Sequence, residues 1–273
     1  MRNKLRSSFT ILLLSIPLLA CGLLRARTSY KWYVVLEVDP SVADRGAATL
    51  ETVEGLNTRL NHVGVIGFRV SVVGASKDGR IRIDLPEVAD RERLKNFIVA
   101  RGLLQLVHVV SDASPAPVQT YSTEDEAKAT IKTAKDRGVL PYAPEPGDSS
   151  ANKIRFVVVE LPPIIDGKDI RTASAVPNYG SPKHHYQIMF TLKSEAAKKF
   201  GAWTGANINE YLGVVLDDEV KSTAFIKSQI FDTGEISGDF TKASAEDLAQ
   251  ILMSGPLPAA VKILEESRSD AAE

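Results

Sequence analysis

Cysteine is almost absent from this chain of 273 residues, which contains a single one, Cys21. One thiol excludes an intrachain disulfide framework and any metal cluster held by several thiolates. An excess of charge is lacking too, because 33 lysines and arginines stand against 34 acidic residues, for a formal net charge of -1. Binding to nucleic acid needs a basic surface. We therefore expect no nucleic acid among the partners.

Catalytic motifs are missing as well. The sequence contains no Gly-x-Ser-x-Gly, no phosphate-binding loop that ends in Gly-Lys, and no His-Glu-x-x-His. The neighbours His184 and His185 would point to opposite faces of a strand, and Asp217 and Asp218 lie where an ordinary turn is expected. We therefore expect no enzyme activity, no cofactor and no metal site.

Long apolar runs are lacking beyond residue 24, but one candidate lies at the N-terminus. The stretch MRNKLRSSFTILLLSIPLLACG begins with three basic residues, continues through an apolar segment at 9–20 and reaches Cys21. This is the layout of a secretory signal. Residues 18–21 resemble the bacterial lipobox, which predicts that residues 1–20 form a lipoprotein signal peptide and that Cys21 is lipidated.

An uncleaved signal anchor at residues 9–24 is the alternative, although the segment is short compared with the roughly 20 residues that span a bilayer. The lipoprotein is the favoured interpretation. Both interpretations place the rest of the chain in the cell envelope, on the periplasmic side, attached to membrane lipid through its N-terminus. Residues 21–33 then serve as a tether.

The first half of the remaining chain has a clear order of elements. A strand is predicted at 33–40, a helix at 47–63, a hairpin at 68–87, a second helix at 90–100 and a strand at 103–110. The helix at 47–63 is indicated by apolar residues that recur every three or four positions. These residues are Leu50, Val53, Leu56, Leu60 and Val63.

The same order recurs in the second half. A strand is predicted at 185–192, a helix at 194–211, a hairpin at 212–230, a helix from 244 to 255 and a closing strand at 259–266. The repeated order predicts an α+β protein of two ferredoxin-like split β-α-β subdomains, with antiparallel-rich sheets backed by helices. The expected boundaries are 34–112 for the first subdomain and 153–266 for the second.

The segments outside these two subdomains have simpler expectations. Residues 113–152 are a connector with one helix, which starts at a cap on Ser122 or Thr123 and ends at Gly138. Residues 154–163 read as a strand that leads into the second subdomain. The charged residues 267–273 form a tail.

The last helix is strongly marked at both ends. Residues 235–243 read as a loop, and Ser244 with Asp247 predicts a capping box that starts the helix. Gly255 is placed to adopt a left-handed conformation after the last turn, and Pro256 prevents continuation. Nothing in this stretch indicates chemistry.

The same region carries a family resemblance. The sequence from 214 to 266 resembles the end of the first periplasmic domain of SecD, an auxiliary subunit of the bacterial Sec protein translocase. The family pattern there is Leu-Asp-Gly, then Ile-x-Gly-x-Phe-Thr, then Leu-Ala-x-x-Leu-x-Ser-Gly-x-Leu-Pro. The matching positions include Asp217, Gly238, Phe240, Thr241, Gly255, Leu257 and Pro258.

Further motifs extend the resemblance over about residues 33–265. Residues 59–65 are similar to the family's Arg-x-Asn-x-x-Gly-Val, and the segments 167–178 and 190–208 also match. Two departures from the pattern are Asp218 and Glu87, which each replace a glycine. The resemblance implies that 34–112 is a base-like and 153–266 a head-like subdomain.

The resemblance also implies a function. A SecD-like domain is expected to bind translocating or unfolded polypeptide and to assist Sec-dependent export, with membrane subunits of the Sec translocon as further partners. Because the chain stops at Glu273, before the later transmembrane helices of SecD, proton-driven pulling by this polypeptide alone is not expected. The alternatives are a structural lipoprotein module that docks on another envelope protein and a divergent domain that binds a small ligand.

Overall fold

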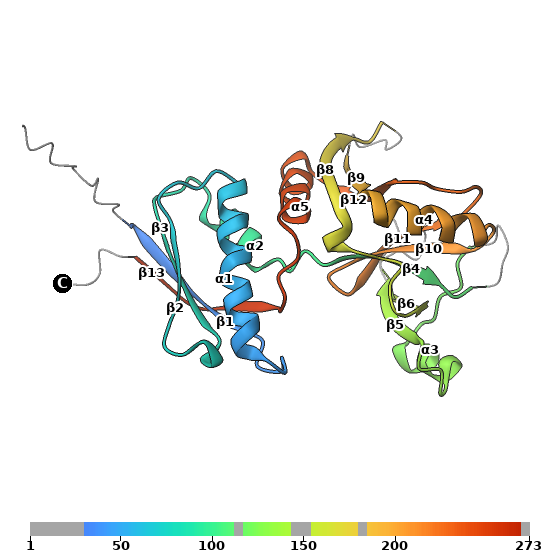
Figure 1. Ribbon diagram of the computed structural model, residues 1–273, viewed down its shortest axis with the longest axis horizontal. Helices are drawn as coiled ribbons and strands as arrows, with labels where there is room; N and C mark the ends of the chain where they lie inside the picture. Colours follow the sequence, from blue (N-terminus) through green and yellow to red (C-terminus); the bar gives the residue numbers. More distant parts are fainter. Residues whose placement is uncertain (1–29, 112–116, 143–153, 180–184, 269–273) are drawn as a thin grey trace, which may run out of the picture.

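The computed structural model describes residues 30–111, 117–142, 154–179 and 185–268, and these form two lobes side by side (Figure 1). Lobe 1 is built from β1 (Trp32–Val38), α1 (Arg45–His62), β2 (Arg69–Val72), β3 (Arg80–Leu85), α2 (Arg91–Val99) and β13 (Val261–Arg268). Its strands form one antiparallel sheet in the order β13-β1-β3-β2.

Local sequence explains the elements of lobe 1. Every second residue of β1 is fully buried, from Trp32 to Val38, as expected of a strand with one face on a core. The side chain of Asp44 accepts a hydrogen bond from the backbone N–H of Ala47 and so caps α1, and Asp90 caps α2 in the same way. Buried apolar residues of both helices pack on the sheet.

Lobe 2 contains the remaining elements. The strands are β4 (Leu104–Val109), β5 (Arg137–Tyr142), β6 (Arg155–Glu160), β7 (Ile165–Asp166), β8 (Ile170–Pro177), β9 (Tyr186–Leu192), β10 (Tyr211–Leu216), β11 (Glu219–Phe225) and β12 (Thr233–Phe240). The helices are α3 (Glu124–Ile131), α4 (Ser194–Ala206) and α5 (Lys242–Ser254). A six-stranded sheet has the order β10-β11-β5-β6-β4-β7, and a three-stranded sheet has the order β12-β9-β8.

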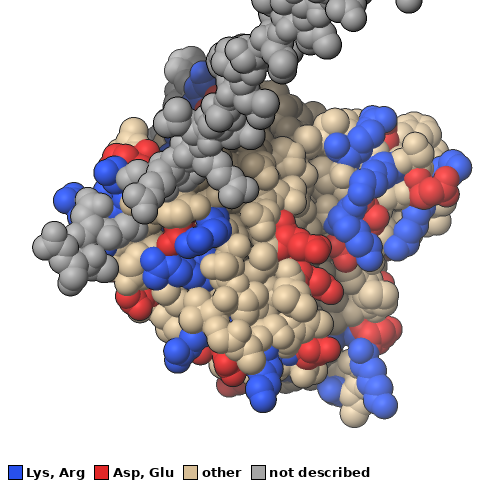
Figure 2. All heavy atoms as spheres, turned by 60° about the vertical axis from the view of Figure 1, so that its left-hand side comes forward, with Lys and Arg blue, Asp and Glu red and all other residues tan. Residues whose placement is uncertain are grey.

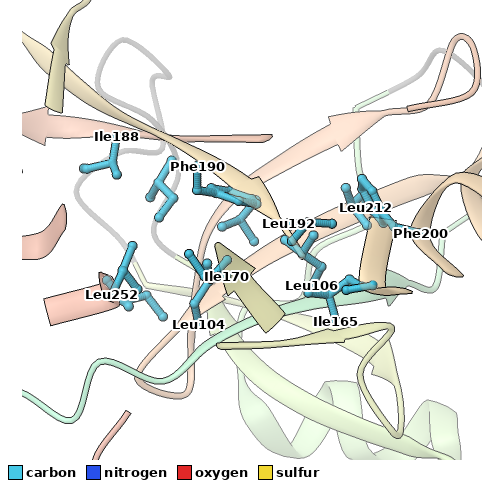
Figure 3. Close-up of a cluster of buried hydrophobic side chains, with 14 of the residues drawn as sticks. Leu104, Leu106, Ile165, Ile170, Ile188, Phe190, Leu192, Phe200, Leu212 and Leu252 are labelled. Atoms are coloured by element: carbon cyan, nitrogen blue, oxygen red, sulfur yellow. The ribbon is translucent and has the colours of Figure 1, made fainter. Parts of the chain in front are cut away.

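β4 is the central strand of lobe 2. It pairs with β10 along its whole length and with β7 and β6 on its other side, so the pairings around the six-stranded sheet return to their start. Leu104 and Leu106 belong to the large core between the two sheets (Figure 3), whereas Val107 and Val109 belong to a small core inside the ring of strands. Both faces of β4 are therefore buried.

The two closing strands do not join the units in which the sequence predicted them. Residues 104–109, expected to close the first subdomain, form β4 of lobe 2, and residues 261–268, expected to close the second, pair with β1 in lobe 1. The prediction of two contiguous units is wrong in this respect. The prediction of a mixed α+β chain, with sheets backed by helices, is confirmed.

Three element boundaries also differ from expectation. The helix predicted to reach Gly138 ends at Ile131, and Gly138 lies in β5; the helix predicted at 194–211 ends at Ala206. Residues 235–240, expected as a loop, belong to β12. The pairing of β12 with β9 makes this segment a strand, although the two glycines and the aspartate of β12 disfavour one.

The predicted capping box of α5 is wrong by three residues. The N-cap is Thr241, whose hydroxyl accepts from the backbone N–H of Ser244, and Asp247 forms an ion pair with Arg93 of α2 instead. Gly255 has a positive φ of 80°, as predicted, but its ψ of 162° lies outside the left-handed helical region. This combination is accessible essentially only to glycine.

The other cap prediction is confirmed, because Thr123 caps α3 by accepting from the N–H of Glu126. Residues 1–29, with the predicted signal and Cys21, lie outside the described residues, as do His184 and residues 143–153. Within the described ranges, none of the helices combines the length and apolar character needed to cross a bilayer.

Candidate functional site

A hollow of about 250 Å³ lies in lobe 2 between β11 and β12. Its walls are residues 222–224 of β11, and residues 233–235 with Ser237 of β12. Its floor is apolar and comprises Leu106, Phe190, Phe200, Leu212 and Val214. Four of these floor residues are labelled in Figure 3, where they come from four different elements, β4, β9, α4 and β10. We call this hollow the edge groove.

Both walls of the edge groove are strand edges with few partners. β12 ends the three-stranded sheet, so β9 occupies only one of its sides. β11 pairs with β10 on one side, while on the other the described residues show only the parallel bridge between Val220 and Tyr142. Unpaired backbone groups at a strand edge can pair with an added extended chain.

A glycine shapes the floor of the edge groove. A Cβ atom added at Gly234 of β12 would come within 2.3 Å of the ring of Phe190. The absent side chain therefore lets the Phe190 ring lie directly beneath β12, where it forms the apolar floor. Gly234 thus has a packing role, which its place in the sequence did not reveal.

A second hollow, of about 600 Å³, lies between the lobes. It is lined by the end of α1, the start of α2 and one side of α5, with Val65, Val88 and Leu94 among its apolar residues. Arg93 and Asp247 line it too and bridge the lobes with two hydrogen bonds of 2.7 Å. We call it the inter-lobe hollow. Its lining comes from helices and loops, so it presents no strand edge.

The joint between the lobes is built on one buried arginine. The two chain crossings, at 100–103 and 255–260, lie side by side, and the N–H of Leu257 donates to the carbonyl of Arg101 at 2.9 Å. Arg59 of α1 is fully buried beneath them and bonds to both. Its guanidinium donates to the carbonyls of Phe97, Ala100, Arg101 and Gly255 and to the hydroxyl of Ser254.

Burial disfavours the positive charge of Arg59, and a nearby carboxylate favours it. Burial lowers the pKa of Arg59 to about 10, and the attraction of Asp217 partly offsets this. Asp217 belongs to the turn between β10 and β11, and its side chain accepts from the N–H of Leu103 at 2.8 Å. The turn also contributes Asp218, which pairs with Arg101 at 2.9 Å. Arg59 therefore remains charged at neutral pH and relies on carbonyl oxygens as its partners.

Among the described residues, His108 lies in a small cluster of titratable side chains. His108 of β4 lies between Glu160, at 2.9 Å, and Glu210, at 3.4 Å, and contacts the ring of Trp203 edge to face. In the part of the chain that the structure describes, no three His, Cys, Asp or Glu side chains are arranged to hold a metal ion.

Comparison with known proteins relates this architecture to one family. Residues 142–259 match the family model of the SecDF P1 head subdomain. SecD of Aquifex aeolicus, a protein translocase subunit, is 38% identical over 217 residues, which are 79% of this chain and 38% of the relative. SecD of Koribacter versatilis is 32% identical over 80% of this chain and 38% of the relative. The chain is similar to SecD over most of its length, and what it matches is a SecDF-type periplasmic domain.

Solved structures of SecDF agree with this similarity. A SecDF structure in a super-membrane-facing form has a TM-score of 0.63 and 26% identity, and covers 87% of this chain and 30% of that chain. A structure from work on SecDF as a membrane component that enhances protein export has a TM-score of 0.61 and 26% identity, over 85% and 98% of the two chains. The chain spans about two fifths of the length of the curated SecD relatives, 38% for the two described above.

The match to the family model of the SecDF P1 head subdomain ends at residue 259, two residues before β13 begins. β13 itself pairs with β1 in lobe 1. The motif residues lie in two places. Asp217, Gly255, Leu257 and Pro258 lie at or next to the joint between the lobes, where Leu257 is buried. The other three, Gly238, Phe240 and Thr241, lie at the end of β12 and the start of α5.

Sequence reasoning missed the edge groove because β12 was read as a loop. It also left Arg59 without a role, although the signal was present: an arginine on the apolar face of a helix, between Leu56 and Leu60. The two hollows differ in kind. The inter-lobe hollow is lined by helices and loops, and the free strand edges lie within lobe 2.

Proposed function

We propose that this chain is a membrane-tethered, extracytoplasmic SecD-type domain that holds translocating or unfolded polypeptide and assists Sec-dependent export, and that it makes and breaks no covalent bond. The observation that carries the proposal is the edge groove, where two sparsely paired strand edges stand over an apolar floor. The tether is the N-terminal segment, with lipidated Cys21 favoured over an uncleaved anchor.

The edge groove suits an extended chain of varied sequence. Backbone hydrogen bonds to a strand edge do not depend on the identity of the bound side chains. Alternate side chains of an extended segment point the same way, so every second one would enter the apolar hollow. At about 250 Å³ the hollow holds one or two side chains and is smaller than the sites that enclose drug-sized ligands. Capture would therefore be weak and quickly reversed.

The proposal includes a finer statement of the fold. The sheet order of lobe 1, β13-β1-β3-β2, is that of a split β-α-β unit whose fourth strand is β13. A unit completed by the far end of the chain would keep lobe 2 attached to the tethered lobe at two points. A holding domain benefits from this, because a pull on bound polypeptide is then shared by two crossings.

Photo-crosslinking in intact cells tests the proposal. A photoreactive amino acid at Ala224, an exposed groove residue opposite the floor residue Leu212, is compared with one at Ser174, an exposed position on β8 at the other edge of the same three-stranded sheet as β12. We expect Ala224 to crosslink to many exported chains in transit and Ser174 to few. A third probe at Gln250 reports on the inter-lobe hollow.

A matched pair of tryptophan substitutions supplies the competition control. Ala224→Trp fills the edge groove and should abolish crosslinks from a second probe at Ser237, whereas Ser174→Trp should leave them unchanged. Crosslinks to one folded envelope protein alone would replace capture by a docking role. Thermal stabilisation by a small metabolite, lost in Ala224→Trp, would favour the ligand-binding alternative.

A further inference from the structure

One apolar side chain of lobe 1 stands out from the surface. Ile66 is 87% exposed, in the loop of residues 63–68 between α1 and β2. Gly64 and Gly67 flank it with φ values of 73° and 80°. Val65 and Phe68 pack against the core of lobe 1 and hold the loop in place. Ile66 therefore projects from a loop that is fixed on both sides.

This loop lies at the end of lobe 1 where the chain enters from its N-terminal segment. Arg69, directly after the loop, pairs with Asp84 of β3, and Asp84 pairs on its other side with Tyr33 of β1. The guanidinium of Arg69 also stacks over the ring of Tyr30 at 5.1 Å. β13 ends at the same place, opposite Trp32 (Figure 1).

The distance to the membrane is limited by the sequence. Tyr30 lies six positions after Leu24, the last residue of the apolar segment, and nine positions after Cys21. At most about 3.6 Å per residue, these stretches of chain reach about 20 Å and about 30 Å. Under the proposed tether, this end of lobe 1 is therefore held within about 30 Å of the lipid surface.

Charge near the loop is compatible with a lipid surface. Arg69 and Arg82 share the carboxylate of Asp84, and Arg82 also stacks over Tyr33, which bonds to Glu265, so the paired charges nearby balance; Lys31 is exposed. On the side of the molecule that Figure 2 shows, positive and negative side chains are interspersed and form no large patch of one sign. Charge alone would thus bind a membrane weakly, and an inserted apolar side chain is needed.

We infer that the loop at residues 63–68 is a second membrane contact, in which Ile66 enters the headgroup and upper acyl region of the bilayer that holds the N-terminal segment. The inference rests on the proposed tethering. One isoleucine would not bind a membrane by itself, but the tether keeps it at a high local concentration next to the lipid. Two attachment points orient lobe 1 on the membrane.

Fluorescence quenching tests the contact with the full chain reconstituted into vesicles of phosphatidylcholine with a minority of phosphatidylglycerol. Ile66→Trp is compared with Tyr179→Trp, a position in lobe 2 that is 88% exposed. Lipids brominated on their acyl chains should quench the emission added by Ile66→Trp about twofold and leave the emission added by Tyr179→Trp unchanged. Equal quenching of both by aqueous iodide, with none by brominated lipid, would overturn the inference.

A second measurement avoids any membrane affinity of tryptophan itself. In the unaltered chain, amide hydrogen exchange in residues 63–68 should be slower on vesicles than in detergent, and Ile66→Ser should remove this difference. Equal exchange in the two media refutes the contact. Vesicle flotation distinguishes failure of the loop contact from failure of the tether. If the chain floats with the vesicles but residues 63–68 exchange at the same rate as in detergent, the loop contact alone is refuted. If the chain does not float, the tether and the loop contact are both refuted.

Discussion

Replacing Arg59 by methionine tests whether a buried guanidinium holds the two lobes together. The side chain is fully buried and makes five hydrogen bonds, four of them to backbone carbonyls at the joint. Hydrogen bonds from a charged donor contribute about 1.5–3 kcal/mol each, and the contacts at 3.3–3.4 Å belong at the low end, so the set contributes about 7 kcal/mol.

Burial of the charge offsets part of this. Burial lowers the pKa of Arg59 to about 10, which corresponds to about 3 kcal/mol of desolvation. Arg59→Met, of similar length, should therefore lower the free energy of unfolding by about 4 kcal/mol. Because the pKa is lowered, the desolvation cost is complete at every pH below about 10 and fades only above that pH. The loss in Arg59→Met should thus be the same in neutral and in mildly acidic buffer.

Urea denaturation in mild detergent measures this loss, with the two tryptophans as separate probes. Trp32 lies in lobe 1 and Trp203 in lobe 2, so single-tryptophan variants report on each lobe. We expect the two transitions to coincide in the parent and to separate in Arg59→Met. Arg93→Met is the control, because its ion pair also joins the lobes but is half exposed, and should cost less than about 1 kcal/mol. A stability equal to or above that of the parent in Arg59→Met would refute the reasoning.

Three further predictions concern lobe 1, the edge groove and α5. Glu37 bonds to Lys262 of β13, and this contact lowers the pKa of Glu37, so its contribution to stability is present above pH 4.5 and is lost on further acidification. In Glu37→Gln, the stability of lobe 1, followed by Trp32 fluorescence, should therefore fall less steeply below pH 4.5 than in the parent. Gly234→Ala forces a methyl group against the aromatic floor and should cost about 1–3 kcal/mol, with a matching fall in groove crosslinks; unchanged values would contradict the packing described here. Thr241→Ala should lower the thermal midpoint by removing about 1 kcal/mol of capping, and Ser244→Ala should have the smaller effect if Thr241 is the cap.

Local patterns in the sequence determined most individual elements. The apolar spacing of α1, the cap at Thr123 and the aspartates of the β10–β11 turn each depend on residues a few positions apart, so their outcome follows from nearby chemistry. The family motifs likewise identified a SecD-type domain. The basic and apolar pattern that ends at Cys21 is of the same local kind and stays a prediction.

Tertiary structure alone decided which strands pair. The alternating pattern of a strand shows which faces are buried but not which partner lies beside it, so β4 and β13 could equally have closed the units in which they occur. β12 is a strand only because β9 pairs with it, and the edge groove exists only because that pairing ends the sheet there. The partners of Arg59 are mostly about 40 or nearly 200 residues away. Such long-range contacts depend on the whole chain, and no short stretch of sequence encodes them.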